Sequence, residues 1–141
     1  MGTCKYYITM HTGDKYGAGT DSDVRVQILG EGAYSRQNLT DKHLLDKSGY
    51  DDFERNDRDT YIISDRDVGN VEYVVISVSS SGWYLDSITI RKEGDPNYYW
   101  HASIHKWFEV SGTPVNDGEL HVTGSLTKQF KMERICTIRP G

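Results

Sequence analysis

Apolar residues recur at every second position in several short stretches of this chain, and this spacing constrains the fold more than any other feature. Tyr6, Ile8 and Met10 fall on one face of an extended strand. Residues 24–28 repeat the pattern, with polar side chains at the positions between. A period of two is that of a half-buried β-strand, whereas a helix needs apolar residues three and four positions apart. The spacing therefore predicts an all-β fold.

Further strands are predicted from runs of β-branched and aromatic residues that are separated by turn residues such as glycine, asparagine and serine. These runs are residues 61–63, 71–78, 84–90, 98–100, 107–110 and 120–126. Residues 71–78 are apolar on both faces, which is typical of a central strand covered on each side. Short strands with such regular punctuation favour an antiparallel sandwich or barrel.

The size and charge of the chain limit its class and its partners. A chain of 141 residues is long enough for one domain with a hydrophobic core. No apolar run approaches the roughly 20 residues that cross a bilayer, and the first residues lack the hydrophobic stretch of a secretory signal, so we expect a cytoplasmic location. We also expect a monomer. The net charge of −5 would repel nucleic acid and anionic lipid. We therefore expect no nucleic-acid partner, and a cation must supply any attraction to phosphate.

The two cysteines lie near opposite ends of the chain. Cys4 and Cys136 could meet if the first and last strands were neighbours, but their spacing does not show this. Reduced, buried thiols are the favoured state in a cytosolic protein.

Carboxylates are crowded between Asp46 and Asp59, where six acidic residues accompany three basic ones. Such crowding is repulsive unless a cation relieves it. Calcium suits this role because it binds six to eight oxygen atoms from flexible loops. Residues 17–21 add glycines that can turn backbone carbonyls toward an ion, together with oxygen atoms from Thr20 and Asp21. The spacing is not that of an EF-hand, and a solvated acidic loop remains the alternative.

Several short motifs occur in an order and spacing that are found together in one known family. The first group is Tyr7-Ile8-Thr9, Thr12-Gly13-Asp14, Gly17-Ala18-Gly19-Thr20-Asp21 and the strand at residues 24–29. The second comprises residues 42–47, 50–55 and 59–61, and the third comprises Trp83-Tyr84-Leu85-Asp86 and Lys106-Trp107. Together they resemble PLAT domains, the lipoxygenase-homology β-sandwiches. The second group resembles the N-terminal domain of animal lipoxygenases in particular.

This resemblance covers roughly residues 5–120. It implies an antiparallel eight-stranded β-sandwich over residues 1–127, with residues 128–141 as a last strand or a C-terminal tail. It also implies calcium in the loops at one end of the sandwich. The implied ligands are Gly17, Gly19, Thr20, Asp21, Asp51, Asp52 and Glu54, and Asp46 from the same acidic stretch completes the predicted set.

Membrane contact is the second implication, and two aromatic residues near the same loops, Tyr16 and Tyr50, are its candidates. The loop at residues 79–82 reads Ser-Ser-Ser-Gly and lacks the acid and the large apolar residues that the family often carries there. We therefore expect a non-catalytic calcium-binding module that associates reversibly with membrane lipid and becomes peripheral to the membrane on calcium binding. The alternative is a protein-interaction module that docks a catalytic domain or another partner, with calcium incidental.

Other side chains that could carry chemistry do not form a recognisable catalytic motif, so no enzymatic activity is expected. His101 and His105 are four residues apart but lack the glutamate of a zinc-protease motif. The serines of residues 79–81 lack the glycine-flanked pattern of a nucleophile elbow. We expect Trp83, Tyr84 and Trp107 to lie in the core, because strand context and the family resemblance both bury them.

Overall fold

The computed structural model describes residues 3–15, 18–19, 23–31, 38–45, 54–79, 82–114 and 120–137, and for residues 109–114 and 120–125 it describes the backbone alone. These residues form ten β-strands: β1 (Thr3–Thr12), β2 (Val24–Gly30), β3 (His43–Leu44), β4 (Arg58–Arg66), β5 (Val71–Val78), β6 (Trp83–Lys92), β7 (Tyr98–Pro114), β8 (Leu120–Ser125), β9 (Thr127–Lys131) and β10 (Glu133–Cys136). Among them there is no helix long and apolar enough to span a membrane.

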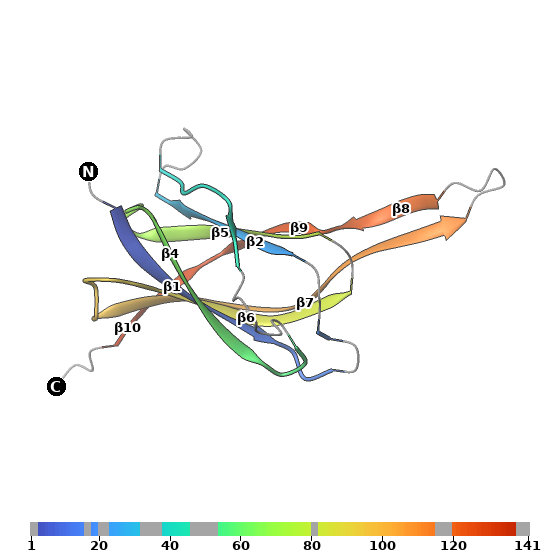
Figure 1. The fold of residues 1–141 in the computed structure, drawn as a ribbon, viewed down its shortest axis with the longest axis horizontal. Coiled ribbons are helices and arrows are strands. Elements are labelled where there is room, and N and C mark those ends of the chain that lie inside the picture. The colour runs from blue at the N-terminus through green and yellow to red at the C-terminus, as the bar shows by residue number, and fades with distance from the viewer. Residues whose placement is uncertain are drawn as a thin grey trace.

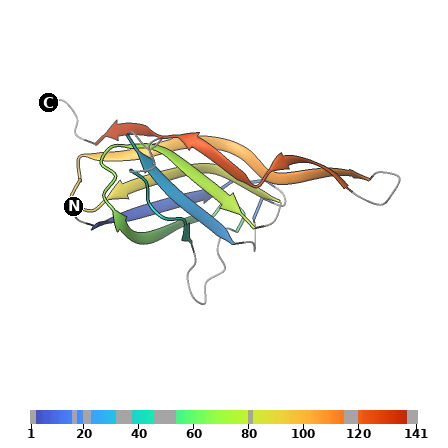
Figure 2. The same cartoon turned by 90° about the horizontal axis from the view of Figure 1, so that it is seen from above.

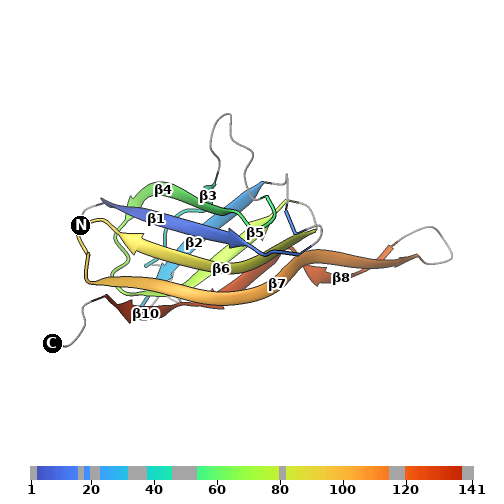
Figure 3. The same ribbon diagram turned by 90° about the horizontal axis from the view of Figure 1, so that it is seen from below.

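The strands form two stacked antiparallel sheets. Sheet A has the order β10-β7-β6-β1-β4, and sheet B has the order β3-β2-β5-β9. Sheet B lies in front in Figure 2 and sheet A in front in Figure 3. The predicted all-β antiparallel sandwich is thereby confirmed. The described strands number ten rather than eight, because β3 is only two residues long and β8 pairs with β7 on a ribbon that runs out beyond both sheets (Figure 1).

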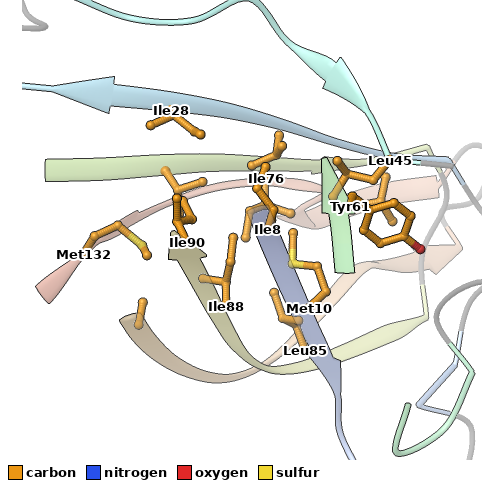
Figure 4. Packing of buried hydrophobic residues seen from close by; sticks show 14 of the residues in the cluster. Ile8, Met10, Ile28, Leu45, Tyr61, Ile76, Leu85, Ile88, Ile90 and Met132 are labelled. Carbon is orange, nitrogen blue, oxygen red and sulfur yellow. The ribbon is translucent and has the colours of Figure 1, made fainter. Parts of the chain in front are cut away.

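The core lies between the two sheets and is built by the alternation that the sequence predicts. Ile8 and Met10 of β1 are fully buried and point toward sheet B, and Ile28 of β2 and Ile76 of β5 face them from that sheet (Figure 4). The side chains between them in sequence are partly exposed. Full burial of one such aliphatic side chain contributes about 1.5–3 kcal/mol to stability. The pattern of period two is thus the main source of the stability of the fold.

The expectation that residues 71–78 are covered on both faces is wrong for the described part of the chain. β5 is central in sheet B, between β2 and β9. Its inward side chains, such as Val74 and Ile76, are fully buried, but Tyr73 and Val75 on the other face are only half-buried. The sandwich has two layers, so a central strand is buried on one side only.

Residues 98–100 and 107–110, which were predicted as two strands, are parts of the single strand β7. The outward residues between them are polar, and the strand bulges at His105, whose φ is 50°. A bulge inserts an extra residue and breaks the period of two, and a polar outer face leaves few apolar residues to detect. Both make a strand difficult to predict from apolar alternation. The strand predicted at residues 120–126 corresponds to β8, which ends one residue earlier, at Ser125.

The last two described strands join different sheets. β9 pairs with β5 at the edge of sheet B, and β10 pairs with β7 at the edge of sheet A.

Because β6 and β7 lie between β1 and β10, the strands of Cys4 and Cys136 are not neighbours. Cys4 is half-buried, and this burial raises the pKa of its thiol. The expected burial of Cys136 is wrong, because this residue ends an edge strand and is exposed. The domain division at residue 127 stays a prediction.

A side-chain hydrogen bond between a histidine and an aspartate connects one edge of sheet B to one edge of sheet A. Nε2 of His43 on β3 lies 2.6 Å from Oδ2 of Asp65 on β4. Partial burial would by itself raise the pKa of Asp65. Hydrogen bonds from His43 and from the backbone N–H groups of Arg66 and Asp41 outweigh this effect and hold the pKa below its usual value. The charged form of Asp65 therefore stabilises the folded state.

This interaction predicts a loss of stability in acid. Since the folded pKa of Asp65 is lower than the unfolded value of about 3.9, its contribution is fully present above about pH 4 and is lost as the pH falls through the folded pKa. Asp65→Asn should therefore lower the free energy of unfolding at pH 6 and reduce its further fall between pH 6 and pH 3, as measured by urea titration. The control Asp95→Asn, in the β6–β7 turn, should behave as the unchanged protein does. An identical acid dependence in both variants would contradict this assignment.

Candidate functional site

Three connections meet at one end of the sandwich, which we call the loop end. Its described residues are 13–15, 18–19, 23, 54–57, 79 and 82. Thr12 N donates to Asp57 O at 2.9 Å, and Asn56 N donates to Gly13 O at 3.2 Å, so the segment before β4 is bonded to the end of β1. Ser79 N donates to Asp23 O at 2.9 Å on the side of sheet B. The prediction that the first and the acidic connections lie at the same end is confirmed for these residues.

The segment after β1 folds back against the start of β6. Gly13 N donates to Tyr84 O at 2.9 Å, and Tyr84 N donates to Ala18 O at 3.0 Å. A Cβ atom on Gly13 would lie 2.3 Å from Cδ1 of the Tyr84 ring, so the close approach requires glycine at this position. Ala18 is fully buried as a result. The sequence motif Thr12-Gly13 is thus explained by the packing of an aromatic ring on the chain.

The charged side chains of the loop end are mainly carboxylates. Asp14 accepts a hydrogen bond from Arg55 Nε at 2.9 Å, which links the first connection to the acidic one, but both side chains are more than half exposed and the pair contributes little to stability. Glu54 is half-buried, and Asp59, which lies in β4 next to the loop end, is 1% exposed. The atoms of the described residues here that could bind a metal ion are therefore oxygen atoms of carboxylates and backbone carbonyls, which are the ligands that calcium prefers.

Two of the predicted calcium ligands, Gly19 and Glu54, fall on described residues, and both are half-buried at the loop end. The other predicted site residues lie outside the described residues: Tyr16, Gly17, Thr20, Asp21, Asp46, Tyr50, Asp51 and Asp52. Among the residues that the structure describes, no three His, Cys, Asp or Glu side chains form a group that could hold a metal ion. Oxygen ligands of the kind that calcium prefers are present among the described residues, and the ligand set stays a prediction.

The tryptophans at this end differ in their surroundings. Trp83 is fully buried, its Nε1 donates to Thr12 Oγ1 at 3.0 Å, and its ring lies 5.4 Å from that of Phe108. The predicted core position is thus confirmed for Trp83. It is wrong for Trp107, which is half-buried on the outer face of sheet A, with its ring edge-on to Tyr84 at 5.2 Å. Tyr84 and Trp107 are opposite each other in the β6–β7 register and share the outer face of sheet A.

A histidine–carboxylate cluster on sheet A escaped the sequence analysis. Asp86 Oδ2 lies 3.3 Å from Nδ1 of His11, and Asp86 Oδ1 lies 2.5 Å from Nδ1 of His105. Nδ1 of His101 instead lies 3.0 Å from Thr89 Oγ1, so the two histidines of β7 contact different residues. No local sequence signal could reveal the cluster, because its members come from β1, β6 and β7 and meet where the strand registers shift.

The comparisons with known proteins agree with this fold. A sequence profile described as the PLAT/LH2 domain matches residues 6–120. The human protein "Lipoxygenase homology domain-containing protein 1" is 34% identical over 100 residues, which are 68% of this chain and 5% of the human protein. The chain thus spans a small fraction of the length of this relative.

Two solved structures are similar over most of the chain. Coral 8R-lipoxygenase, described with calcium activation via a C2-like domain, superposes with a TM-score of 0.68 at 19% identity, over 92% of this chain and 17% of the enzyme. A calcium-dependent 11R-lipoxygenase superposes with a TM-score of 0.56 at 31% identity, over 74% of this chain and 16% of that enzyme. The fold and the order of motifs therefore define a β-sandwich of the lipoxygenase-homology class. The chain belongs to the PLAT/LH2 domain family.

Proposed function

We propose that this chain is a non-catalytic module that binds calcium at the loop end and through it associates reversibly with a lipid membrane. The observation that supports this most directly is the hydrogen bonding between the two predicted ligand connections, Thr12 N to Asp57 O and Asn56 N to Gly13 O. The calcium dependence of the 11R-lipoxygenase relative, at 31% identity, adds to it. In a cell the module would be cytoplasmic and become peripheral to the membrane when calcium binds.

The physical role of calcium would be to neutralise the acidic connection and to bridge its carboxylates to lipid phosphate. Without an ion, a chain of net charge −5 is repelled by anionic lipid. With the ion in place, Tyr16 and Tyr50 are the proposed contacts with the headgroup region, where tyrosine is favoured. The contribution of two tyrosines is modest, so attachment would be reversible.

Calcium titration by calorimetry tests this proposal. The unchanged chain should release or take up heat on binding calcium, and Asp51→Ala combined with Asp52→Ala should abolish this signal. The matched control, Glu93→Ala combined with Asp95→Ala, also removes two carboxylates, but from the turn at the opposite end, and should bind calcium as before. Co-sedimentation with anionic vesicles should require calcium and disappear with a chelator. Equal pelleting in both conditions would contradict the calcium-dependent mechanism.

A protein-interaction module is the second candidate, and the outer face of sheet B favours it. Leu44 is 45% exposed there, and Tyr73 and Val75 are half-buried. In this case calcium would be incidental. The Asp51→Ala and Asp52→Ala variant would then keep its partner while losing any calcium-linked rise in melting temperature.

A further inference from the structure

Residues 54–57, the described part of the acidic connection, contact sheet A through one side chain of β1 in addition to their backbone hydrogen bonds. Nε2 of His11 lies 3.2 Å from Oδ1 of Asn56, which is two residues after Glu54. On its other side, Nδ1 of His11 lies 3.3 Å from Oδ2 of Asp86. The imidazole of His11 therefore lies between a loop residue and a strand residue. Its side chain is only 13% exposed, so the ring has little freedom to turn away.

The carboxylate that supports His11 is itself held in place. Asp86 lies in the irregular part of the β6–β7 pairing and accepts a second contact from Nδ1 of His105, at 2.5 Å. His105 has a φ of 50°, a conformation that non-glycine residues adopt rarely. This backbone geometry occurs where the β6–β7 register shifts and lets the imidazole reach Asp86 from the neighbouring strand. Asp86 is thereby fixed by residues of two strands.

Asn56 has the geometry of a turning point in the acidic connection. Its φ of 62° is in the left-handed region, which asparagine tolerates better than most residues. Its backbone N–H donates to Gly13 O at 3.2 Å, and the N–H of Asp57 donates to Glu54 O at 3.0 Å. A side-chain contact at Asn56 thus adds to the backbone hydrogen bonds that hold residues 54–57 on the end of β1. The contacts run without a break from His105 through Asp86, His11 and Asn56 to this turn.

We propose that His11 is a positioning residue for the predicted calcium site: supported by Asp86 and His105, it holds Asn56 and so helps to fix residues 54–57 on the end of β1. The expected effect on calcium affinity rests on the proposed function, whereas the positioning of residues 54–57 exists without the ion. An ordered loop loses less conformational freedom on binding than a mobile one. Loss of the contact therefore weakens calcium binding although no ligand is removed.

Amide hydrogen exchange of the calcium-free protein tests the positioning itself. Asn56→Gly is the first variant, because glycine accepts the φ of 62° and the side chain is lost without backbone strain. Exchange of the amide at residue 56 should accelerate about fivefold, which corresponds to the loss of one hydrogen bond. His11→Ala should have the same effect. Asn56→Asp keeps the acceptor oxygen and should restore slow exchange.

A matched control and a calcium titration complete the experiment. His101→Ala removes another histidine from the same face of sheet A, one that bonds Thr89 and not the loop, and should leave exchange at residue 56 unchanged. Calcium affinity should fall about fivefold in Asn56→Gly and in His11→Ala, with the melting temperature of Asn56→Gly nearly unchanged. Unchanged exchange at residue 56 in both variants overturns the positioning role. Faster exchange in a chain that binds no calcium supports the positioning and rejects the proposed function instead.

Discussion

Trp83→Ala should lower the free energy of unfolding by about 3–5 kcal/mol. Trp83 is fully buried between the sheets, and its ring lies 5.4 Å from that of Phe108. Alanine would leave a cavity the size of an indole and would also remove the Nε1–H that bonds Thr12 Oγ1, a hydroxyl on a fully buried residue. Loss of packing and loss of a buried hydrogen bond act in the same direction.

Urea unfolding of purified variants measures this loss, and two comparisons separate its causes. Trp83→Phe keeps most of the ring volume but loses the donor, so it should destabilise the protein by clearly less than alanine does. Trp107→Ala removes the same side chain from a half-buried position on the outer face and should also have a smaller effect. Equal losses for Trp83→Ala and Trp107→Ala would show that the burial assigned to Trp83 is wrong.

Gly30→Ala should be the second most damaging change, with a loss of about 2–3 kcal/mol from overpacking. Gly30 ends β2, and its N–H donates to Asn38 O at 2.9 Å. A Cβ atom there would lie 2.2 Å from the backbone oxygen of Val68 and 2.6 Å from Nδ2 of Asn38. The nearest atom belongs to the backbone, so a rotamer change cannot relieve the clash. The end of sheet B would have to separate from the segment before β5.

Gly94→Ala is the comparison that isolates the steric effect, again by urea unfolding. Gly94 has a φ of 81°, and a Cβ atom there would meet no other atom within 4 Å, so alanine carries only the conformational penalty of about 1–2 kcal/mol. Gly30 has no such positive φ, and its penalty comes from contact alone. If Gly30→Ala were no more harmful than Gly94→Ala, the close approach to Val68 would be absent in solution.

The parts of the fold that were predictable from sequence are those where one face of a strand is buried and the other faces solvent. Residues 6–10 and 24–28 show this alternation, and both became strands with the predicted inward faces. β7 was predicted only at two short stretches because its middle is polar outside and bulged at His105. β3 was missed because two residues are too short for any period to be detected.

The meeting of the two predicted ligand connections at one end was predictable from the sequence, whereas the side chains that contact them there were not. The acidic stretch and the glycine-rich turn have a local composition that can be read from the chain, and the sandwich brings their described parts to one end. His11, Asp86 and His105 are far apart in sequence and meet only through strand pairing and register shifts. Neither the partner strand nor the position of a bulge follows from local spacing, so their contact could not be foreseen.

The ribbon formed by β7 and β8 divides one strand between two regions of different local stability. From Tyr98 to Phe108, β7 is part of sheet A and contributes side chains to the core. From Glu109 to Pro114 it pairs with β8 alone, and an isolated two-stranded hairpin is marginally stable in water. The outer half can therefore open as a separate cooperative unit while the inner half stays folded. A single continuous strand would thus belong to two units that unfold separately.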